Sequence, residues 1–449
     1  MDIRDKKISI IGAVRSGIGA AKLAKKMGAI PFVSDSGTKE NLKDAISVFD
    51  ELGISYEYGN HSDRVYDCYF IVTSPGVPTN SPVLQKAVEK GIKIFSEVEF
   101  ASWFCKGKII SITGTNGKTT TTALMNHTLN ECGLKSYEAG NIGKAFTEVA
   151  PVVKDDEYVS LETSSFQLDF TDRFKPFFSL ILNITPDHLD RYNNSFDGYI
   201  ASKMKVANNQ DEDDFFVYNA DDNLTFATLQ NKHVQKIGFS LKKELQVGTY
   251  LKNSKLYFAW FGSVTEVCSV DDLFIKGEHN IANALAVLAV AKTLNLLNQK
   301  IRNAFKTFKG VEHRIEFVRE LNGVEYYNDS KATNVDSVLV ALKTFNKPLY
   351  LILGGKDKGN NYDQIKDLVL RNVKKIYAIG SSAQKVYDYF GSIVTTEKKE
   401  SLESCVTAAR KEAGPGSVVL LSPACASFDM FNNYEHRGKV FKQAVNDLK

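Results

Sequence analysis

The sequence contains few cysteines and no closely spaced pair of them. Its six cysteines are scattered through 449 residues, and none belongs to a CxxC motif. This distribution excludes the common zinc-binding spacings. It also suits a reducing compartment better than the disulfide-stabilised domains of secreted proteins.

Long hydrophobic runs are missing as well. The longest purely apolar stretch lies near Ala284–Ala291, far short of the roughly 18 residues that a membrane-spanning helix needs. The segment Met1–Arg15 scatters charges among its apolar residues and has no signal-peptide core. We therefore expect a cytoplasmic protein without a membrane span.

The charge is nearly balanced, with 56 Lys and Arg against 53 Asp and Glu, a net charge of +3. Such a balance does not favour a nucleic-acid or acidic-membrane partner. Hydrophobic residues make up 43% and charged residues 24%, which is typical of a globular protein rather than a disordered one. At about 150 residues per domain, the length predicts roughly three domains.

Three stretches of the chain begin with an apolar strand that runs into a turn rich in glycine or small polar residues. The three strands are Lys7–Gly12, Lys108–Thr113 and Pro348–Leu353. Each opens a region in which short β-branched runs alternate with amphipathic helical segments, the pattern of a parallel sheet. We therefore predict an α/β protein with three domains.

Patterning also predicts where these domains meet. We expect an N-terminal Rossmann-like domain (1–98), a central domain with a P-loop ATPase-like parallel sheet (99–310), and a C-terminal Rossmann-like domain (311–449). Helical periodicity over Ile281–Phe308 ends just before the second boundary. Short alternating segments within Gln246–Ile275 predict a small antiparallel insertion in the central domain.

The segment Gly114-Thr115-Asn116-Gly117-Lys118-Thr119-Thr120 is the most informative motif. It lies between a predicted strand and a predicted helix, where glycines and the helix N-terminus can cradle a phosphate. Lys118 would supply a full positive charge, and the Thr119 hydroxyl is the expected magnesium ligand. The usual GxxxxGK[ST] spacing would place the first glycine at position 112, which is Ile112, so the loop is a shortened version.

Polar side chains follow the next two predicted strands. Glu162 lies near the end of the predicted strand Glu157–Thr163, and a carboxylate there is well placed to bind magnesium beside a phosphate loop. His188 follows Phe177–Ile184 and is a candidate metal ligand or base. Composition alone, by contrast, describes Lys203 as an ordinary lysine on a helix surface.

The predicted N-terminal domain carries a weaker nucleotide signal. Gly12, Gly17 and Gly19 resemble a dinucleotide-binding turn, and Asp35 ends the next predicted strand. Ser74-Pro75-Gly76 follows a further apolar strand, so a second loop lines the same sheet edge. The pattern indicates docking of a nucleotide phosphate or sugar and leaves an NAD-binding oxidoreductase open.

Two loops of the predicted C-terminal domain are crowded with small polar residues. They are Asn328–Asn334, which includes a lysine, and Ser422–Asp429. Both follow apolar strands. Cationic and hydroxyl groups at strand ends suit a dicarboxylate or a phosphate ligand.

Together these motifs resemble the Mur ligase family over essentially the whole chain. The loop Gly114–Thr120 is similar to the ATP loop that this family shares with folylpolyglutamate synthases. The segments Asp329–Asn334 and Leu421–Asp429 resemble those of family members that add D-glutamate. The resemblance implies an ATP-dependent amide ligase that adds D-glutamate to UDP-N-acetylmuramoyl-L-alanine through an acyl phosphate during peptidoglycan synthesis.

The resemblance also implies a set of site residues. The implied contacts of the UDP substrate are Arg15, Ser16, Asp35, Ser36, Ser74, Pro75, Gly76 and Asn141. The implied ATP contacts are Gly114, Thr115, Asn116, Gly117, Lys118, Thr119, Thr120, Asn280, Asn283, Arg314 and Asp329. The implied D-glutamate contacts are Lys331, Thr333, Lys358, Ser427 and Tyr434, with Lys356 as an alternative to Lys358.

The implied catalytic residues are Lys118, His188 and Lys203, and Lys203 matches a lysine that is carbamylated in the family. Two Mg²⁺ ions would be held by Thr119, Glu162, His188 and the carbamylated Lys203. The resemblance implies a monomer that acts on small molecules, without nucleic acid. Three alternatives stay open: a related ligase that uses another amino acid or extends folate, an NAD-binding oxidoreductase, and a nucleotide-binding regulator without catalytic activity.

Overall fold

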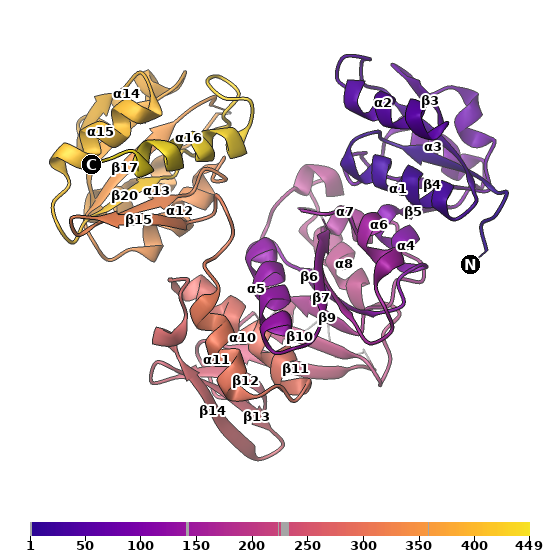
Figure 1. Ribbon diagram of the computed structural model, residues 1–449, viewed down its shortest axis with the longest axis horizontal. Helices are drawn as coiled ribbons and strands as arrows, with labels where there is room; N and C mark the ends of the chain where they lie inside the picture. Colours follow the sequence, from indigo (N-terminus) through magenta and orange to yellow (C-terminus); the bar gives the residue numbers. More distant parts are fainter. Residues whose placement is uncertain (1, 141–142, 223, 226–232, 358) are drawn as a thin grey trace. The chain divides into compact units, whose positions relative to one another are not determined.

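The computed structural model describes residues 2–140, 143–222, 224–225, 233–357 and 359–449. The chain forms two compact units, the first made of Met1–Leu273 and Ile281–Lys306, the second of Phe274–Asn280 and Thr307–Lys449. Among the described residues the strands form three sheets, two in the first unit and one in the second (Figure 1). The α/β class agrees with the prediction from sequence.

The first sheet has five parallel strands in the order β3-β2-β1-β4-β5. Its strands are β1 (Lys7–Ile11), β2 (Ile30–Asp35), β3 (Ser55–Tyr58), β4 (Phe70–Thr73) and β5 (Ile94–Ser96). The helices of this region are α1 (Arg15–Lys26), α2 (Lys43–Leu52), α3 (Pro82–Glu89) and α4 (Glu97–Ser102). The strand order is that of a Rossmann-like half, which brings the turns after β1 and β4 to one sheet edge.

The second sheet has nine strands in the order β14-β13-β12-β11-β10-β9-β6-β8-β7. Its strands are β6 (Lys108–Thr113), β7 (Ser136–Gly140), β8 (Tyr158–Glu162), β9 (Phe178–Ile181), β10 (Phe215–Asn219), β11 (Gln235–Ser240), β12 (Val247–Lys252), β13 (Lys255–Trp260) and β14 (Ser263–Ser269). The helices in and after this sheet are α5 (Lys118–Glu131), α6 (Phe146–Val149), α7 (Ser165–Leu168), α8 (Phe196–Met204), α10 (Glu278–Thr293) and α11 (Asn298–Thr307). Strands from β7 to β12 pair in parallel, as expected for strands whose residues are apolar on both faces.

The antiparallel segment of the central region is confirmed, and it extends the main sheet. β13 pairs antiparallel with both β12 and β14, while β12 pairs in parallel with β11. The helical stretch predicted over Ile281–Phe308 is divided into two helices, α10 and α11, with Asn295 at a left-handed φ of 57° between them. The apolar run Ala284–Ala291 is fully buried within α10, because a helix that is apolar on all sides packs inside a protein.

The third sheet lies in the second compact unit and has the order β15-β16-β20-β17-β18-β19. Its strands are β15 (Glu316–Leu321), β16 (Val324–Asn328), β17 (Leu349–Gly354), β18 (Val373–Ile379), β19 (Thr395–Lys398) and β20 (Val418–Leu421). Its helices are α12 (Val335–Thr344), α13 (Asp363–Asn372), α14 (Ala383–Phe390), α15 (Leu402–Glu412) and α16 (Tyr434–Asn446). Only the edge strand β15 is antiparallel to its neighbour, so the ends of β16, β20 and β17 lie side by side.

None of the helices in the described part of the chain is long and apolar enough to cross a bilayer.

Candidate functional site

The loop between β6 and α5 has the backbone conformation of an anion-binding turn. Gly114 and Gly117 have φ values of 151° and 87°, which residues with a side chain rarely adopt. Gly117 is the N-cap of α5, and a Cβ at this position would lie 2.6 Å from Oδ1 of Asn283. The helix begins at Lys118, so the N–H groups of its first turn lie at the loop.

A neighbouring segment holds this loop in place. The side-chain amide of Asn183 accepts a hydrogen bond from the Asn116 N–H (2.8 Å) and donates one to the Asn116 carbonyl (3.0 Å). The Thr115 hydroxyl donates to the carbonyl of Thr185 and accepts from its N–H, both at 3.0 Å. The phosphate loop is therefore fixed to the segment that leads to His188.

Three predicted catalytic residues, Lys118, His188 and Lys203, line one cavity of about 350 Å³ in the first unit. Pro75 and Gly76, predicted to contact the UDP substrate, line the same cavity. The loop predicted to bind ATP and the loop predicted to contact the UDP substrate thus line the same cavity.

Lys203 is buried, with 1% of its surface exposed. Its Nζ donates to the Gly114 carbonyl (2.9 Å) and lies 4.6 Å from the centre of the Tyr199 ring. Burial and the nearby Lys118 charge lower the pKa of Lys203 well below its usual value, while Asp187 opposes the shift. The composition-based interpretation of Lys203 as a surface lysine is therefore wrong.

Lys118 folds back over the phosphate loop. Its Nζ donates to the carbonyls of Gly114 and Thr115, both at 2.9 Å. Gly114 thus accepts hydrogen bonds from Lys118 and from Lys203, so the two amines converge on one carbonyl. The Lys118 ammonium supplies positive charge to the loop that would bind a phosphate.

His188 is exposed and has a left-handed backbone conformation, with φ 52° and ψ 31°. Its Nε2 lies 3.6 Å from Oδ2 of Asp187, and its ring meets the edge of Phe166 at 5.3 Å between centroids. A polar residue held in an uncommon conformation at the mouth of a cavity is typical of a functional position.

The other predicted magnesium ligands lie at neighbouring element ends. Glu162 is the last residue of β8, is 3% exposed, and pairs in register with Ile112 of β6. Thr119 is 6% exposed in the first turn of α5. These oxygen donors stand at the carboxyl edge of the sheet, which suits a hard cation such as Mg²⁺. The burial of Lys203 and its lowered pKa fit the predicted carbamate.

Asp35, predicted to contact a nucleotide, has a structural task in the described residues. Its carboxylate accepts hydrogen bonds from the N–H groups of Ala13 (2.6 Å) and Gly37 (2.7 Å), which fixes the turn after β1. In the same turn Gly17 approaches Gly12 so closely that a Cβ would lie 1.7 Å from the Gly12 carbonyl oxygen. Arg15 donates to the Gly140 carbonyl (3.1 Å), next to the predicted contact Asn141, which lies outside the described residues.

Ser16, Ser36 and Ser74 are the serines predicted to contact the UDP substrate, and each lies in or next to a turn that follows a strand of the first sheet. Ser16 is in the first turn of α1, Ser36 follows β2 and is exposed, and the Ser74 hydroxyl donates to the Gly12 carbonyl at 3.3 Å. They share the sheet edge of the β1 and β4 turns.

The residues predicted to contact D-glutamate, as far as they are described, lie in the second unit. Lys331 and Thr333 follow β16, Ser427 follows β20, and Tyr434 begins α16. Lys358 lies outside the described residues, whereas Lys356 donates its backbone N–H to the Ala426 carbonyl at 2.8 Å.

The four predicted ATP contacts outside the phosphate loop are divided between the two units. Asn283 adjoins the phosphate loop in the first unit, and Asn280, Arg314 and Asp329 belong to the second. Asp329 is buried and accepts from the Ser422 hydroxyl (2.7 Å) and the Ile315 N–H (3.2 Å). Burial raises its pKa to about 7 in spite of those hydrogen bonds.

Sequence reasoning missed several residues that line the cavity. Arg191 places its guanidinium 4.6 Å from the Phe166 ring and donates to the Gly76 carbonyl at 3.3 Å. Tyr199 and Asp187 also line it. Tyr199 precedes Lys203 by four residues on α8, a helical spacing that could have associated the two.

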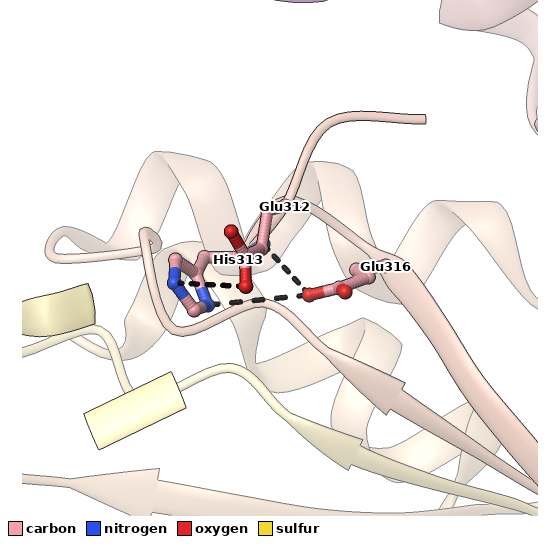
Figure 2. A group of neighbouring side chains, drawn as sticks. All are labelled: Glu312, His313 and Glu316. Atoms are coloured by element: carbon pink, nitrogen blue, oxygen red, sulfur yellow. Dashed lines mark hydrogen bonds and ion pairs between the residues drawn. The ribbon is translucent and has the colours of Figure 1, made fainter. Parts of the chain in front are cut away.

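Glu312, His313 and Glu316 form a further group with metal-ligand chemistry (Figure 2). The ammonium of Lys442, however, contacts Oε1 of both Glu312 (3.1 Å) and Glu316. Oε2 of Glu316 accepts from the His313 N–H and from the Asn328 amide, both at 2.9 Å. The group already holds a cation and acts as an ion-pair cluster.

Comparison with known protein families finds three matches along the chain. Residues 6–96 match the Mur ligase MurD-like N-terminal domain, residues 112–291 the Mur ligase middle domain, and residues 313–425 the glutamate ligase domain of Mur ligases.

Curated relatives match over the full length. A UDP-N-acetylmuramoylalanine–D-glutamate ligase of Koribacter versatilis is 42% identical over 449 residues, covering 100% of this chain and 99% of the relative. The protein of the same name from Christiangramia forsetii is 43% identical, with 99% and 100% covered.

Among solved structures, UDP-N-acetylmuramate-alanine ligase MurC of Thermotoga maritima superposes with a TM-score of 0.62 at 20% identity, covering 99% of this chain and 100% of that one. MurF ligase of Thermotoga maritima in complex with ADP gives 0.58 at 15% identity, covering 93% and 95%. At such identities the superpositions show a shared fold.

Proposed function

The chain belongs to the Mur ligase family, and we propose that it joins D-glutamate to UDP-N-acetylmuramoyl-L-alanine with hydrolysis of ATP to ADP and phosphate. The observation that carries this proposal is the identity of 42–43% along the full chain to relatives named for that reaction. The cavity lined by Lys118, His188 and Lys203 supports the proposal. Pro75 and Gly76, from the loop after β4 of the first sheet, line the same cavity as these three residues of the central region.

Each domain has its own part in this proposal. The N-terminal domain (1–98) holds the UDP substrate, the central domain (99–310) binds ATP, and the C-terminal domain (311–449) binds D-glutamate. This division places the UDP contacts at the turns after β1 and β4, and the D-glutamate contacts at the ends of β16 and β20. The NAD-binding alternative loses its support, because the turn after β1 belongs to a Mur ligase domain in this chain.

ATP would lie along the loop Gly114–Thr120, with its phosphates facing the backbone N–H groups and Lys118. Asn280, Asn283, Arg314 and Asp329 would complete its contacts. The positive charges of Lys118 and Arg191 counter the repulsion between a substrate carboxylate and the polyanionic nucleotide.

Mg²⁺ would be held by Thr119, Glu162, His188 and carbamylated Lys203, as two ions. Bound there, the metal would neutralise phosphate charge. The described residues fit this role: Glu162 is a buried carboxylate at the sheet edge, and Lys203 is buried with a lowered pKa. A neutral amine is the form that adds CO₂, forming an N–C bond and releasing a proton, which converts Lys203 into an anionic oxygen ligand.

The reaction then needs two displacements. A carboxylate oxygen of the terminal L-alanine attacks the γ-phosphorus, the bond to the β–γ bridging oxygen breaks, and ADP leaves. The amine of D-glutamate attacks the carbonyl carbon of the acyl phosphate, the bond from carbon to the phosphate oxygen breaks, and the nitrogen loses a proton. His188, which is exposed and lines the cavity, is the proposed base, and metal binding by the same imidazole would compete with that role.

D-Glutamate would be held by Lys331 and Lys358 (or Lys356) through its two carboxylates. Thr333, Ser427 and Tyr434 would fix its orientation. These groups stand on adjacent strand ends of one parallel sheet, where ligands of such sheets bind.

The test measures phosphate release with UDP-N-acetylmuramoyl-L-alanine, ATP and Mg²⁺, with and without D-glutamate. We expect release that depends on D-glutamate and a product larger by one glutamyl group. Parallel assays with L-alanine, meso-diaminopimelate and L-glutamate separate the proposal from a related ligase. Equal or faster release with one of these would overturn the choice of D-glutamate, and absence of release with all of them would overturn the ligase proposal.

A further inference from the structure

Arg437 is an arginine in the interior of the second unit. It lies in the first turn of α16, is 2% exposed, and ranks among the largest fully buried side chains of the described residues. Burial lowers its pKa to about 10, so the guanidinium keeps its charge at neutral pH. A buried charge is costly unless its donors are all directed at acceptors, so the position calls for an explanation.

The guanidinium joins two loops through three hydrogen bonds. Nε donates to the Ser330 hydroxyl (3.0 Å) and Nη2 to the Ser330 carbonyl (2.8 Å). Nη1 donates to the Cys425 carbonyl (3.0 Å). The first loop follows β16 and the second follows β20, two strands that pair in parallel.

A third loop closes on the same group. Gly355 follows β17, and a Cβ built on it would lie 3.2 Å from Nη1 of Arg437 and 2.5 Å from the Ala426 carbonyl oxygen. The next residue, Lys356, donates its N–H to that Ala426 carbonyl at 2.8 Å. The guanidinium thus lies where three strand-end loops converge.

These loops carry the groups assigned to D-glutamate above. Lys331 is adjacent to Ser330, Ser427 is two residues from Cys425, and Lys356 is adjacent to Gly355. The Ser330 hydroxyl, which accepts from Nε, itself donates to the carbonyl of Tyr434 at 2.8 Å. Each contact of Arg437 is therefore one or two residues away from a proposed ligand group.

We propose that Arg437 is a positioning residue for D-glutamate: by tying the carbonyls of Ser330 and Cys425 together, its guanidinium sets the spacing between Lys331 and Ser427. The inference rests on the proposed function, since it takes D-glutamate as the ligand of these loops. Only arginine fits this position, because its planar fork directs several N–H groups at fixed angles, whereas lysine offers one rotating ammonium.

The test compares Arg437→Lys with Arg319→Lys in the full-length chain. Arg319 is a matched control, because its Nη1 also donates to main-chain carbonyls of the second unit, those of Val445 and Asn446 at the end of α16. We expect Arg437→Lys to raise the KM for D-glutamate about tenfold or more, with the KM values for ATP and the UDP substrate changed less than about twofold. Arg319→Lys should leave all three unchanged.

Amide hydrogen exchange without substrates gives a second readout, independent of activity. Arg437→Lys should speed exchange at Lys331–Thr333 and at Ala426–Ser427 more than at β17 and β18. Uniformly faster exchange, or KM values that rise equally for all substrates, would overturn the proposal by showing general destabilisation. If the lysine variant does not fold, Ser330→Ala removes one acceptor of the same guanidinium, and it should give a smaller change of the same pattern.

The two proposals fail in different ways. Wild-type protein that releases no phosphate in response to D-glutamate would refute the proposed function. The exchange rates of the two loops still decide whether Arg437 sets their spacing.

Discussion

The amine of Lys203 lies where a positive charge is unfavourable. Water has little access to it, its hydrogen bond to the Gly114 carbonyl is made by a group that is 1% exposed, and Lys118 adds a like charge nearby. A lowered pKa keeps a larger fraction of the amine neutral at physiological pH, and a neutral amine is nucleophilic. Carbamylation would convert this unfavourable cation into an anion beside the phosphate loop.

Lys203→Ala should therefore abolish ligation, lowering kcat by at least about 100-fold. A short-chain carboxylic acid added to the assay should restore part of the activity, because its carboxylate can occupy the place of the carbamate. Lys205→Ala is the control, since Lys205 lies two residues away and its ammonium pairs with Asp169 at 3.3 Å. Full activity of Lys203→Ala would refute the carbamate.

Lys331 allows the D-glutamate assignment to be tested directly. Lys331→Ala should raise the KM for D-glutamate at least about tenfold while changing the KM for ATP far less, since a charged hydrogen bond to a carboxylate would be lost. Lys343→Ala, at an exposed position in the last turn of α12, should change neither constant. Equal rises in both KM values would argue against the assignment. Initial rates at varied substrate concentration provide the measurement.

At the scale of elements, the turn before α5 depends on one backbone conformation. Gly117 is the N-cap of the helix and has a φ of 87°, and a Cβ built on it would lie 2.6 Å from Oδ1 of Asn283. Gly117→Ala should cost about 1–3 kcal/mol of stability, because a side chain is strained in this conformation and meets Oδ1 of Asn283. The same substitution should also raise the KM for ATP, since the N–H groups of the loop would shift.

Urea unfolding and ATP kinetics measure the two effects. Gly414→Ala is the control, because Gly414 has no positive φ and a Cβ there would meet nothing within 4 Å. Its stability should stay within about 0.5 kcal/mol of wild type. A Gly117→Ala protein as stable and as active as this control would contradict the prediction.

Elements with strong local patterns could be predicted from sequence, and those decided by tertiary contacts could not. β1, β6 and β17 were visible as apolar runs that end in small residues, since parallel strands are buried on both faces. The break between α10 and α11 was hidden because apolar periodicity continues through it. That β12 would join β11 depends on pairing between strands, which a local alternating pattern does not encode.

At the scale of the whole molecule, the residue types in the sequence motifs located the site, but they did not show which of its side chains are buried. Lys118 and His188 could be identified from motifs at strand ends, and both line the cavity. The burial of Lys203 follows from the packing of α8 against the phosphate loop. The identity of a residue in the sequence does not show whether its side chain is exposed or buried. Arg437 escaped notice for the same reason, because its acceptors are backbone carbonyls of residues far away in sequence.

The first unit also contains a buried carboxyl group that links its two sheets. Glu97, in the first turn of α4, accepts a hydrogen bond from the Gln167 amide at 2.6 Å, while its other oxygen has no hydrogen-bond partner among the described residues. Burial raises the pKa of Glu97 from 4.5 to about 7, although Gln167 and Ser16 oppose the shift. The folded state therefore favours the protonated form.

The sign of the pH effect follows from this shift. Because the folded-state pKa lies above the unfolded value, the contribution of Glu97 to stability is complete below about pH 4.5 and is lost as pH rises through 7. The shift corresponds to about 3 kcal/mol over that range. Glu97→Gln keeps the shape of the side chain without the charge, so it should remove most of this dependence.

Tryptophan fluorescence can follow the first unit alone, because both tryptophans, Trp103 and Trp260, belong to it. Urea unfolding at pH 5 and pH 8 should show a loss of stability in wild type at the higher pH and a smaller one in Glu97→Gln. Glu89→Gln, at an exposed position near the end of α3, should follow wild type. If Glu97→Gln and wild type lost stability in parallel between pH 5 and pH 8, another group would be responsible, and the carboxyl of Glu97 would have to be ionised in the folded protein throughout this range.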